Sequence, residues 1–123
     1  MNWASLLLVF LGGGLGSLTR FGVGQMSIQL VEKYKFPIGT IIANTLACFV
    51  LGLFIYLYKD KMVENEWVKY FVMIGFCGGF STFSTFSLDS IQLFQNNLFI
   101  YGFLNIIISV LLGLFVLWTL IKL

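Results

Sequence analysis

The sequence contains no histidine and very little charge, because only 10% of its 123 residues are Asp, Glu, Lys or Arg. Without histidine, a metal-ligand spacing or a nucleophile beside a base, it offers no site for acid–base or metal chemistry, and we expect no enzymatic activity. Its two cysteines, Cys48 and Cys77, lie in separate apolar runs, where we expect free thiols. The single proline, Pro37, closes a polar stretch that we expect to be a connecting segment, residues 24–36.

Apolar sequence fills most of the chain, which is 59% hydrophobic and 18% aromatic with a mean hydropathy of +0.99. Ordinary soluble domains are not so apolar. A helix needs roughly 20 residues to cross a bilayer, and four runs reach or approach that length, at residues 3–20, 39–58, 70–94 and 98–121. The first run lacks the basic start and cleavage site of a signal peptide. The composition predicts an all-α membrane protein, with four transmembrane helices in a single domain.

The third run is interrupted by residues that are unusual at membrane depth. Gly78-Gly79 weakens a helix by roughly 1 kcal/mol per glycine relative to alanine, and hydroxyl residues interleaved with phenylalanine follow. Broken backbone inside a bilayer is tolerated only where it is buried in protein or lines a polar cavity. We therefore predict that the third helix is broken at Gly78-Gly79 and that its freed carbonyls face something other than lipid.

Polar residues in the first two spans have roles that the sequence leaves open between packing and ion contact. Arg20 follows Gly12 and Gly16 on one helix face, either as a snorkelling residue at the helix end or as a positive charge at the mouth of an anion path. Thr40 and Asn44 share a face of the second span. The Asn44 amide either joins two helices or offers its N–H donors to an anion.

The last two spans leave the same choice. The residues Phe80, Phe83 and Phe86 form a stripe about 120° wide, which either packs or turns positive ring edges toward an anion. Asp89, beyond this stripe, is expected near the membrane surface. The fourth span carries a row at spacings of four, either a packing seam or a line of donors across the membrane: Tyr101, Asn105, Ser109 and Gly113.

The positive charges are divided almost evenly between the two sides of the predicted bundle. The side with both termini carries Lys59, Lys61, Lys69 and Lys122, and the other side carries Arg20, Lys33 and Lys35. This split fixes no single orientation by the positive-inside rule. It is either a weak signal in a short protein or the mark of a chain that inserts both ways up and forms an antiparallel dimer.

Three motifs stand in order along the chain: Gly12-Gly13-x-x-Gly16-x-x-x-Arg20-Phe21, Gly39-Thr40-x-x-x-Asn44 and Cys77-Gly78-Gly79-Phe80-Ser81-Thr82-Phe83-Ser84-Thr85-Phe86-Ser87. With these motifs the chain resembles the CrcB/Fluc family of small fluoride channels over essentially its whole length. The resemblance implies an antiparallel, dual-topology homodimer in the bacterial inner or plasma membrane. It also implies two narrow pathways at the subunit interface, through which fluoride leaves the cell passively.

The resemblance also implies roles for individual residues of this sequence. Asn44 matches the pore asparagine, Phe83 and Phe86 match the pore phenylalanines, and Arg20 matches the family arginine, which we place at the pore mouth. A structural sodium ion would lie on the two-fold axis, held by the backbone carbonyls of Gly78 and Ser81 from both copies. The remaining residues expected along the fluoride pore are Thr40, Thr82, Thr85, Asn105 and Ser109.

Two positions depart from the family pattern, and two other functions compete with a channel. Ala47 stands where the family often has glycine, and Gly113 where some members have serine or threonine, which leaves open a heterodimer with a paralogue. A small multidrug exporter would need a membrane-embedded carboxylate, and the first span has none. A non-transporting membrane assembly subunit would explain the glycines but not the polar rows.

Overall fold

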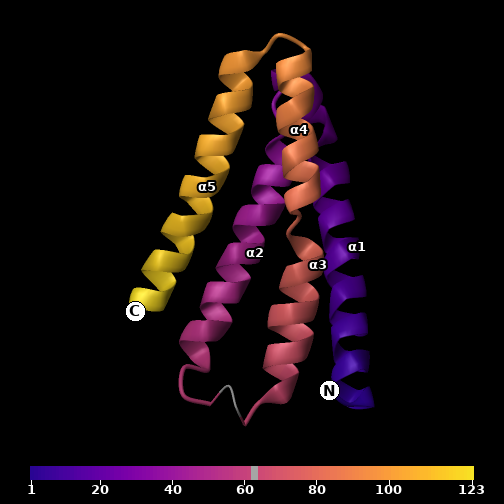
Figure 1. Ribbon diagram of the computed structural model, residues 1–123, viewed down its shortest axis with the longest axis vertical. Coiled ribbons are helices and arrows are strands. Elements are labelled where there is room, and N and C mark those ends of the chain that lie inside the picture. The colour runs from indigo at the N-terminus through magenta and orange to yellow at the C-terminus, as the bar shows by residue number, and fades with distance from the viewer. Residues whose placement is uncertain (62–63) are drawn as a thin grey trace.

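The computed structural model describes residues 1–61 and 64–123 as a bundle of long helices whose successive spans run in opposite directions (Figure 1). The first, second and fourth spans are α1 (Trp3–Tyr34), α2 (Ile38–Leu57) and α5 (Phe99–Lys122). The third span has three pieces, η1 (Val68–Cys77), α3 (Gly78–Phe80) and α4 (Phe83–Gln95). All four spans are long and apolar enough to cross a membrane, which confirms the predicted all-α membrane fold.

Helix α1 is longer than the first predicted span. It begins with a reciprocal cap, in which the Ser5 amide donates to Asn2 Oδ1 over 2.8 Å and the Asn2 amide donates to Ser5 Oγ over 3.2 Å. It ends at Tyr34, where Lys35 turns to a left-handed φ of 52°. The prediction of a connecting segment at residues 24–36 was therefore wrong for most of its length, because polarity alone does not break a helix and the only proline comes later. Arg20 consequently lies within the helix and not at its end.

The break in the third span lies after the predicted position. Gly78 has helical backbone angles, with φ −64° and ψ −37°, whereas Ser81 and Thr82 are extended. The prediction of a break at Gly78-Gly79 was wrong because packing overrides the weak helix propensity of glycine. A Cβ atom at Gly79 would collide with the backbone carbonyl of Gly13, so Gly79 allows the helices to approach closely.

The tightest packing joins α1 to η1 and α3 by direct backbone contact. A Cβ atom on Gly12 would collide with the carbonyl oxygen of Phe71, and one on Gly16 with that of Phe76. The glycines are four residues apart on α1, while the carbonyls are five apart on η1, a π-helix whose hydrogen bonds span five residues. Two helices of different pitch are thus matched along this contact.

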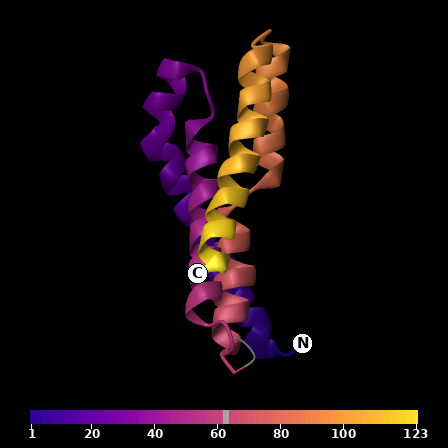
Figure 2. The ribbon, with the colours of Figure 1, turned by 90° about the vertical axis from the view of Figure 1, so that its left-hand side faces the viewer.

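Around this contact the bundle is open, as expected for a chain surrounded by lipid. Its small buried cluster contains Ala43, Ala47 and Phe80, while large apolar residues such as Phe10 and Trp118 are exposed. Figure 2 shows that, at the top of the bundle, the C-terminal end of α1 and the N-terminal end of α2 lie on one side, and the C-terminal end of α4 and the N-terminal end of α5 lie on the other. Both cysteines are free, which confirms that prediction.

Candidate functional site

The side chain of Asn44, on α2, holds the break in the third span. Its Oδ1 accepts a hydrogen bond of 2.7 Å from the Thr82 amide, and its Nδ2 donates one of 3.2 Å to the Thr82 carbonyl. In a continuous helix the Thr82 amide would donate to the carbonyl of Gly78, four residues earlier. The amide of Asn44 takes that place, so a contact between two spans replaces the bonds lost at the break.

Thr82 also begins the second half of the span. Its Oγ1 accepts a hydrogen bond of 3.2 Å from the Thr85 amide, which makes Thr82 the N-cap of α4. The same hydroxyl lies 3.1 Å from Ser84 Oγ and 3.3 Å from Thr85 Oγ1. The Thr82 hydroxyl therefore pairs with a free N–H at the start of α4, and the hydroxyls of Ser84 and Thr85 pair with Thr82.

A groove of about 270 Å³ runs beside the break, between α2, α4 and α5. It brings together several residues that the sequence pointed to for the pore. Within it the rings of Phe83 and Phe86 are 5.9 Å apart between centroids and tilted by 45°. Phe83 is 80% exposed, so its ring projects away from the rest of this chain. The residues lining the groove are Asn44, Cys48, Ser81, Thr82, Phe83, Phe86, Ser109 and Val110.

The hydrogen bonds in the groove determine which donors remain for a ligand. Ser81 Oγ donates to the Cys77 carbonyl over 2.8 Å, and Ser109 Oγ donates to Asn105 Oδ1 over 3.3 Å. A side-chain amide has two N–H groups, and the Thr82 carbonyl takes one from Asn44. Within residues 1–61 and 64–123 the second N–H of Asn44 has no acceptor, so it can donate to a ligand in the groove, beside two aromatic rings.

Three residues expected along the pore do not line this groove. Thr85 lies in the first turn of α4, and Thr40 Oγ1 donates to Asp89 Oδ2 over 2.7 Å. Asn105 is 1% exposed, and its Nδ2 donates to Ser90 Oγ over 2.9 Å. The sequence analysis missed Ser90, whose only signal was a hydroxyl four residues after Phe86.

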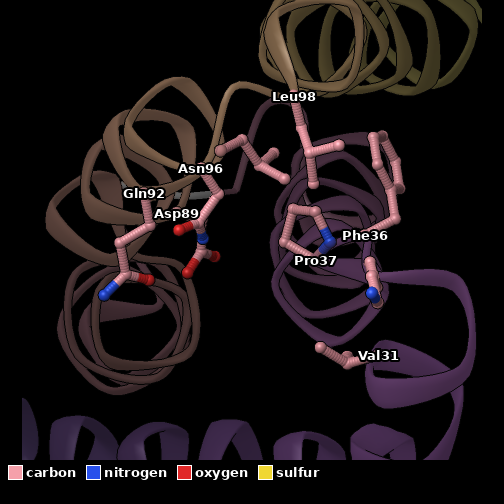
Figure 3. A pocket seen from close by; sticks show the side chains of 9 residues that line it. Val31, Phe36, Pro37, Asp89, Gln92, Asn96 and Leu98 are labelled. Atoms are coloured by element: carbon pink, nitrogen blue, oxygen red, sulfur yellow. The ribbon is translucent and has the colours of Figure 1, made fainter.

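A wider cleft of about 500 Å³ opens at the end of the bundle where α1 meets α2 and α4 meets α5. Figure 3 shows the polar groups of Asp89, Gln92 and Asn96 on one wall and Phe36 and Pro37 on the other. Thr40, whose partner Asp89 lines the cleft, is one helical turn from Asn44, which lines the groove. The other lining residues of the cleft are Val31, Lys35, Leu93 and Leu98.

The other candidate residues lie elsewhere. Arg20 is partly buried in α1, and its Nε atom has no hydrogen-bond partner within residues 1–61 and 64–123. Gly78 and Ser81 line a second groove, of about 210 Å³, together with Cys48 and Cys77. The Gly78 carbonyl lacks the Thr82 amide, which donates to Asn44 instead, and free carbonyl oxygens suit a hard cation.

Comparison with known proteins places the chain in a family. The family model described as CrcB-like protein, Camphor Resistance (CrcB), matches residues 7–120. The chain belongs to the CrcB family. Among CrcB relatives, a protein of Flavobacterium psychrophilum named fluoride-specific ion channel FluC is 40% identical over 119 residues, covering 94% of this chain and 92% of the relative. A protein of Phocaeicola vulgatus with the same name is 44% identical over 110 residues, 89% of each chain.

A third relative with the same name, from Pyrococcus abyssi, is 40% identical over 113 residues, which cover 90% of this chain and 88% of the relative. The resemblance to the CrcB/Fluc family is thus confirmed, and the chain is a multi-pass protein of the cell membrane. The two positions that depart from the CrcB pattern are both packed against neighbouring residues. Ala47 is 2% exposed, and a Cβ atom at Gly113 would lie 3.3 Å from Cys48 Sγ, so Cys48 fills space that a side chain at position 113 would take.

Proposed function

We propose that this chain is a fluoride channel that lets fluoride leave the cell passively, and that it is not an enzyme. The observation that carries the proposal is that Asn44, which lines the groove with Phe83 and Phe86 at a helix break, has one N–H without an acceptor in the part of the chain that the structure describes. A channel must bind its ion strongly enough to dehydrate it and weakly enough to release it. Neutral amide donors and ring edges meet this demand better than a buried cation would. The names of the CrcB relatives support the same function.

The proposed path runs from the cleft to the groove. The cleft has space for hydrated fluoride, and the polar side chains of Gln92 and Asn96 keep it wet. One turn further along α2, the N–H of Asn44 replaces one water of the ion. The edges of Phe83 and Phe86 then face the ion on the other side of the groove, where they attract an anion without the strong charge that would trap it.

A second copy in the inverted orientation is part of the proposal. The groove is open on one side, and Phe83 is 80% exposed in the single chain. An ion there would remain in contact with lipid, which a partner subunit would prevent. The even division of Lys and Arg favours insertion in both orientations. We therefore propose an antiparallel homodimer, with a heterodimer with a paralogue as the alternative pairing.

The residues at the break also fit a structural sodium ion. The carbonyl oxygens of Gly78 and Ser81 would hold it, since Gly78 is exposed and loses its helical partner at the break. Two copies would supply four such oxygens. When bound, the ion would supply fixed positive charge between the two pathways. Within one chain, Asn44 Oδ1 accepts the hydrogen bond of the Thr82 amide, which leaves the Gly78 carbonyl available.

One observation favours a second candidate, a proton-coupled exporter. Asp89 is a partly buried carboxylate inside the third span, in contact with Thr40. A coupled exporter would use such a group to carry protons. It would then require a proton gradient, whereas a channel requires only the gradient of its own ion.

The test is ion efflux from liposomes that contain the purified chain alone, with protein-free liposomes as the control. We expect rapid fluoride efflux with equal pH on both sides, and retention of chloride in parallel samples. Chloride efflux as fast as fluoride efflux would contradict the fluoride channel. Fluoride efflux that appears only with a pH difference would favour the coupled exporter. No efflux from the chain alone, restored by a co-purified paralogue, would indicate the heterodimer.

A further inference from the structure

Behind the groove, a chain of hydrogen bonds joins α4 to α5. Ser90 Oγ donates to the Phe86 carbonyl over 2.9 Å, Asn105 Nδ2 donates to Ser90 Oγ over 2.9 Å, and Ser109 Oγ donates to Asn105 Oδ1 over 3.3 Å. Ser90 is 4% exposed and Asn105 is 1% exposed, so bulk water does not compete for their polar groups. Ser109 also lines the groove, so the chain of bonds ends at the proposed fluoride path.

The Phe86 carbonyl, at the buried end of this series of hydrogen bonds, fixes the direction of every bond in the series. The Phe86 carbonyl can only accept, so it takes the single proton of the Ser90 hydroxyl. Ser90 can then only accept from Asn105, which must present its NH₂ group. The amide oxygen of Asn105 is left facing Ser109, which must donate. The hydroxyl proton of Ser109 is therefore directed away from the groove, and its lone pairs are directed toward it.

We propose that Ser90 and Asn105 are positioning residues that hold the Ser109 hydroxyl as a hydrogen-bond acceptor toward the pathway. This inference rests on the proposed function, since it concerns how the groove handles fluoride. Fluoride can only accept hydrogen bonds, so Ser109 offers it no direct contact in this state. A water molecule that donates one O–H to Ser109 and the other to fluoride satisfies both partners.

The ion in the groove is thus dehydrated on one side only. The N–H of Asn44 replaces a water on the α2 side, while the ion keeps a water on the α5 side beside Ser109. Retaining that water weakens fluoride binding, which favours release and rapid conduction. Ser90, which does not line the groove, sets this balance through Asn105.

Ser90→Ala tests the proposal because it removes the acceptor of the Asn105 NH₂ group. A buried N–H without a partner is rarer in proteins than an unpaired carbonyl, so the Asn105 amide should turn and donate to Ser109. The Ser109 proton then faces the groove and donates to fluoride. A hydrogen bond to a charged group changes affinity by about tenfold. We expect the fluoride concentration that gives half-maximal efflux to fall by about tenfold.

The same substitution in a Ser109→Ala background gives the decisive control, because no hydroxyl is left to turn. There, Ser90→Ala should leave the half-maximal concentration unchanged, and Ser90→Thr in the otherwise wild-type chain should match wild type. Thr119→Val is the matched control on α5, because its hydroxyl also donates to a backbone carbonyl, that of Val116, but does not line the groove. A Ser90→Ala effect that is absent, opposite in sign or equal in both backgrounds would overturn the proposal.

A measurement without transport separates this proposal from the proposed function. In ¹⁵N-labelled protein, the NH₂ signals of Asn105 should shift in Ser90→Ala and change little in Ser109→Ala. A clear shift in Ser109→Ala would show that the NH₂ group faces Ser109. This result needs no folded Ser90→Ala protein, and it would overturn the proposal. Wild-type liposomes without fluoride efflux, both with the chain alone and with a co-purified paralogue, would overturn the proposed function, whereas these amide signals alone decide the direction of the hydrogen bonds.

Discussion

The two halves of the third span contact the rest of the bundle in different ways. In η1 and α3, Gly75 and Gly79 lie against the backbone of α1, and no side chain separates the two helices at these points. At the start of α4 and further along it, polar side chains of the other spans, Asn44 and Asn105, make hydrogen bonds to it, and near its end the Phe94 ring packs on Phe103 of α5. The first half is held by close backbone packing, whereas the second half is held in part by hydrogen bonds, which leave some donors and acceptors free. The second half therefore offers side-chain donors for an anion, whereas the first half offers only the backbone carbonyl of Gly78, which suits a cation.

The largest expected effect comes from filling the shape-dependent contact. Gly16→Ala places a Cβ atom against the carbonyl of Phe76, and backbone cannot move aside as a side chain can. We expect a loss of about 3 kcal/mol of stability or more, with little folded protein. Gly14→Ala is the control, because its Cβ atom meets nothing within 4 Å. It should gain up to about 1 kcal/mol from helix propensity. Thermal unfolding in detergent compares the two, and equal stability would show that the glycine contact is not tight.

Asn44→Asp changes the pair of hydrogen bonds that joins α2 to Thr82 at the start of the second half. The carboxylate still accepts from the Thr82 amide, but it repels the Thr82 carbonyl and replaces the free N–H with negative charge. We expect fluoride efflux to fall by more than about 100-fold, since an anion then faces an anion. Folding should be weakened by about 2 kcal/mol because the pair loses one bond. Efflux within a few fold of wild type would remove Asn44 from the pathway.

Phe83→Ile and Phe86→Ile keep an apolar side chain of similar bulk but remove the ring quadrupole. If the rings act through their edges, either change should lower fluoride efflux by more than about tenfold while the protein stays folded. If they only pack, efflux should persist and stability should fall by roughly 1–3 kcal/mol, mainly for the less exposed Phe86. Efflux and unfolding measured on the same preparations distinguish these outcomes.

The smallest expected effect is on the fraction of copies that a reagent labels from each side of the membrane. If copies insert both ways up, the loop between α2 and η1 lies on one side of the membrane in one half of the copies and on the opposite side in the other half. Glu64→Cys in a background with Cys48→Ser and Cys77→Ser should react with an impermeant thiol reagent from both sides in comparable amounts. Reaction from a single side would exclude the antiparallel dimer.

The same comparison explains what the sequence could predict. The lengths of the apolar runs predicted the four spans, because membrane-spanning helices depend on local composition. The motifs predicted that Asn44, Phe83 and Phe86 would meet, and they line one groove. The exact site of the break was missed because a residue 38 positions away along the chain sets it. Likewise, the pairing of Thr40 with Asp89 depends on how two spans dock, which no local pattern records.

The π-helix of η1 makes the register of the bundle depend on the number of residues in the chain. A spacing of five residues in η1, from Phe71 to Phe76, matches a spacing of four residues in α1, from Gly12 to Gly16. An ordinary α-helix would need one residue fewer to cover the same turn. A substitution leaves this register unchanged, whereas a deletion or insertion within η1 would rotate everything beyond it, including the broken segment and α4. The length of this segment, in addition to its composition, is therefore under constraint.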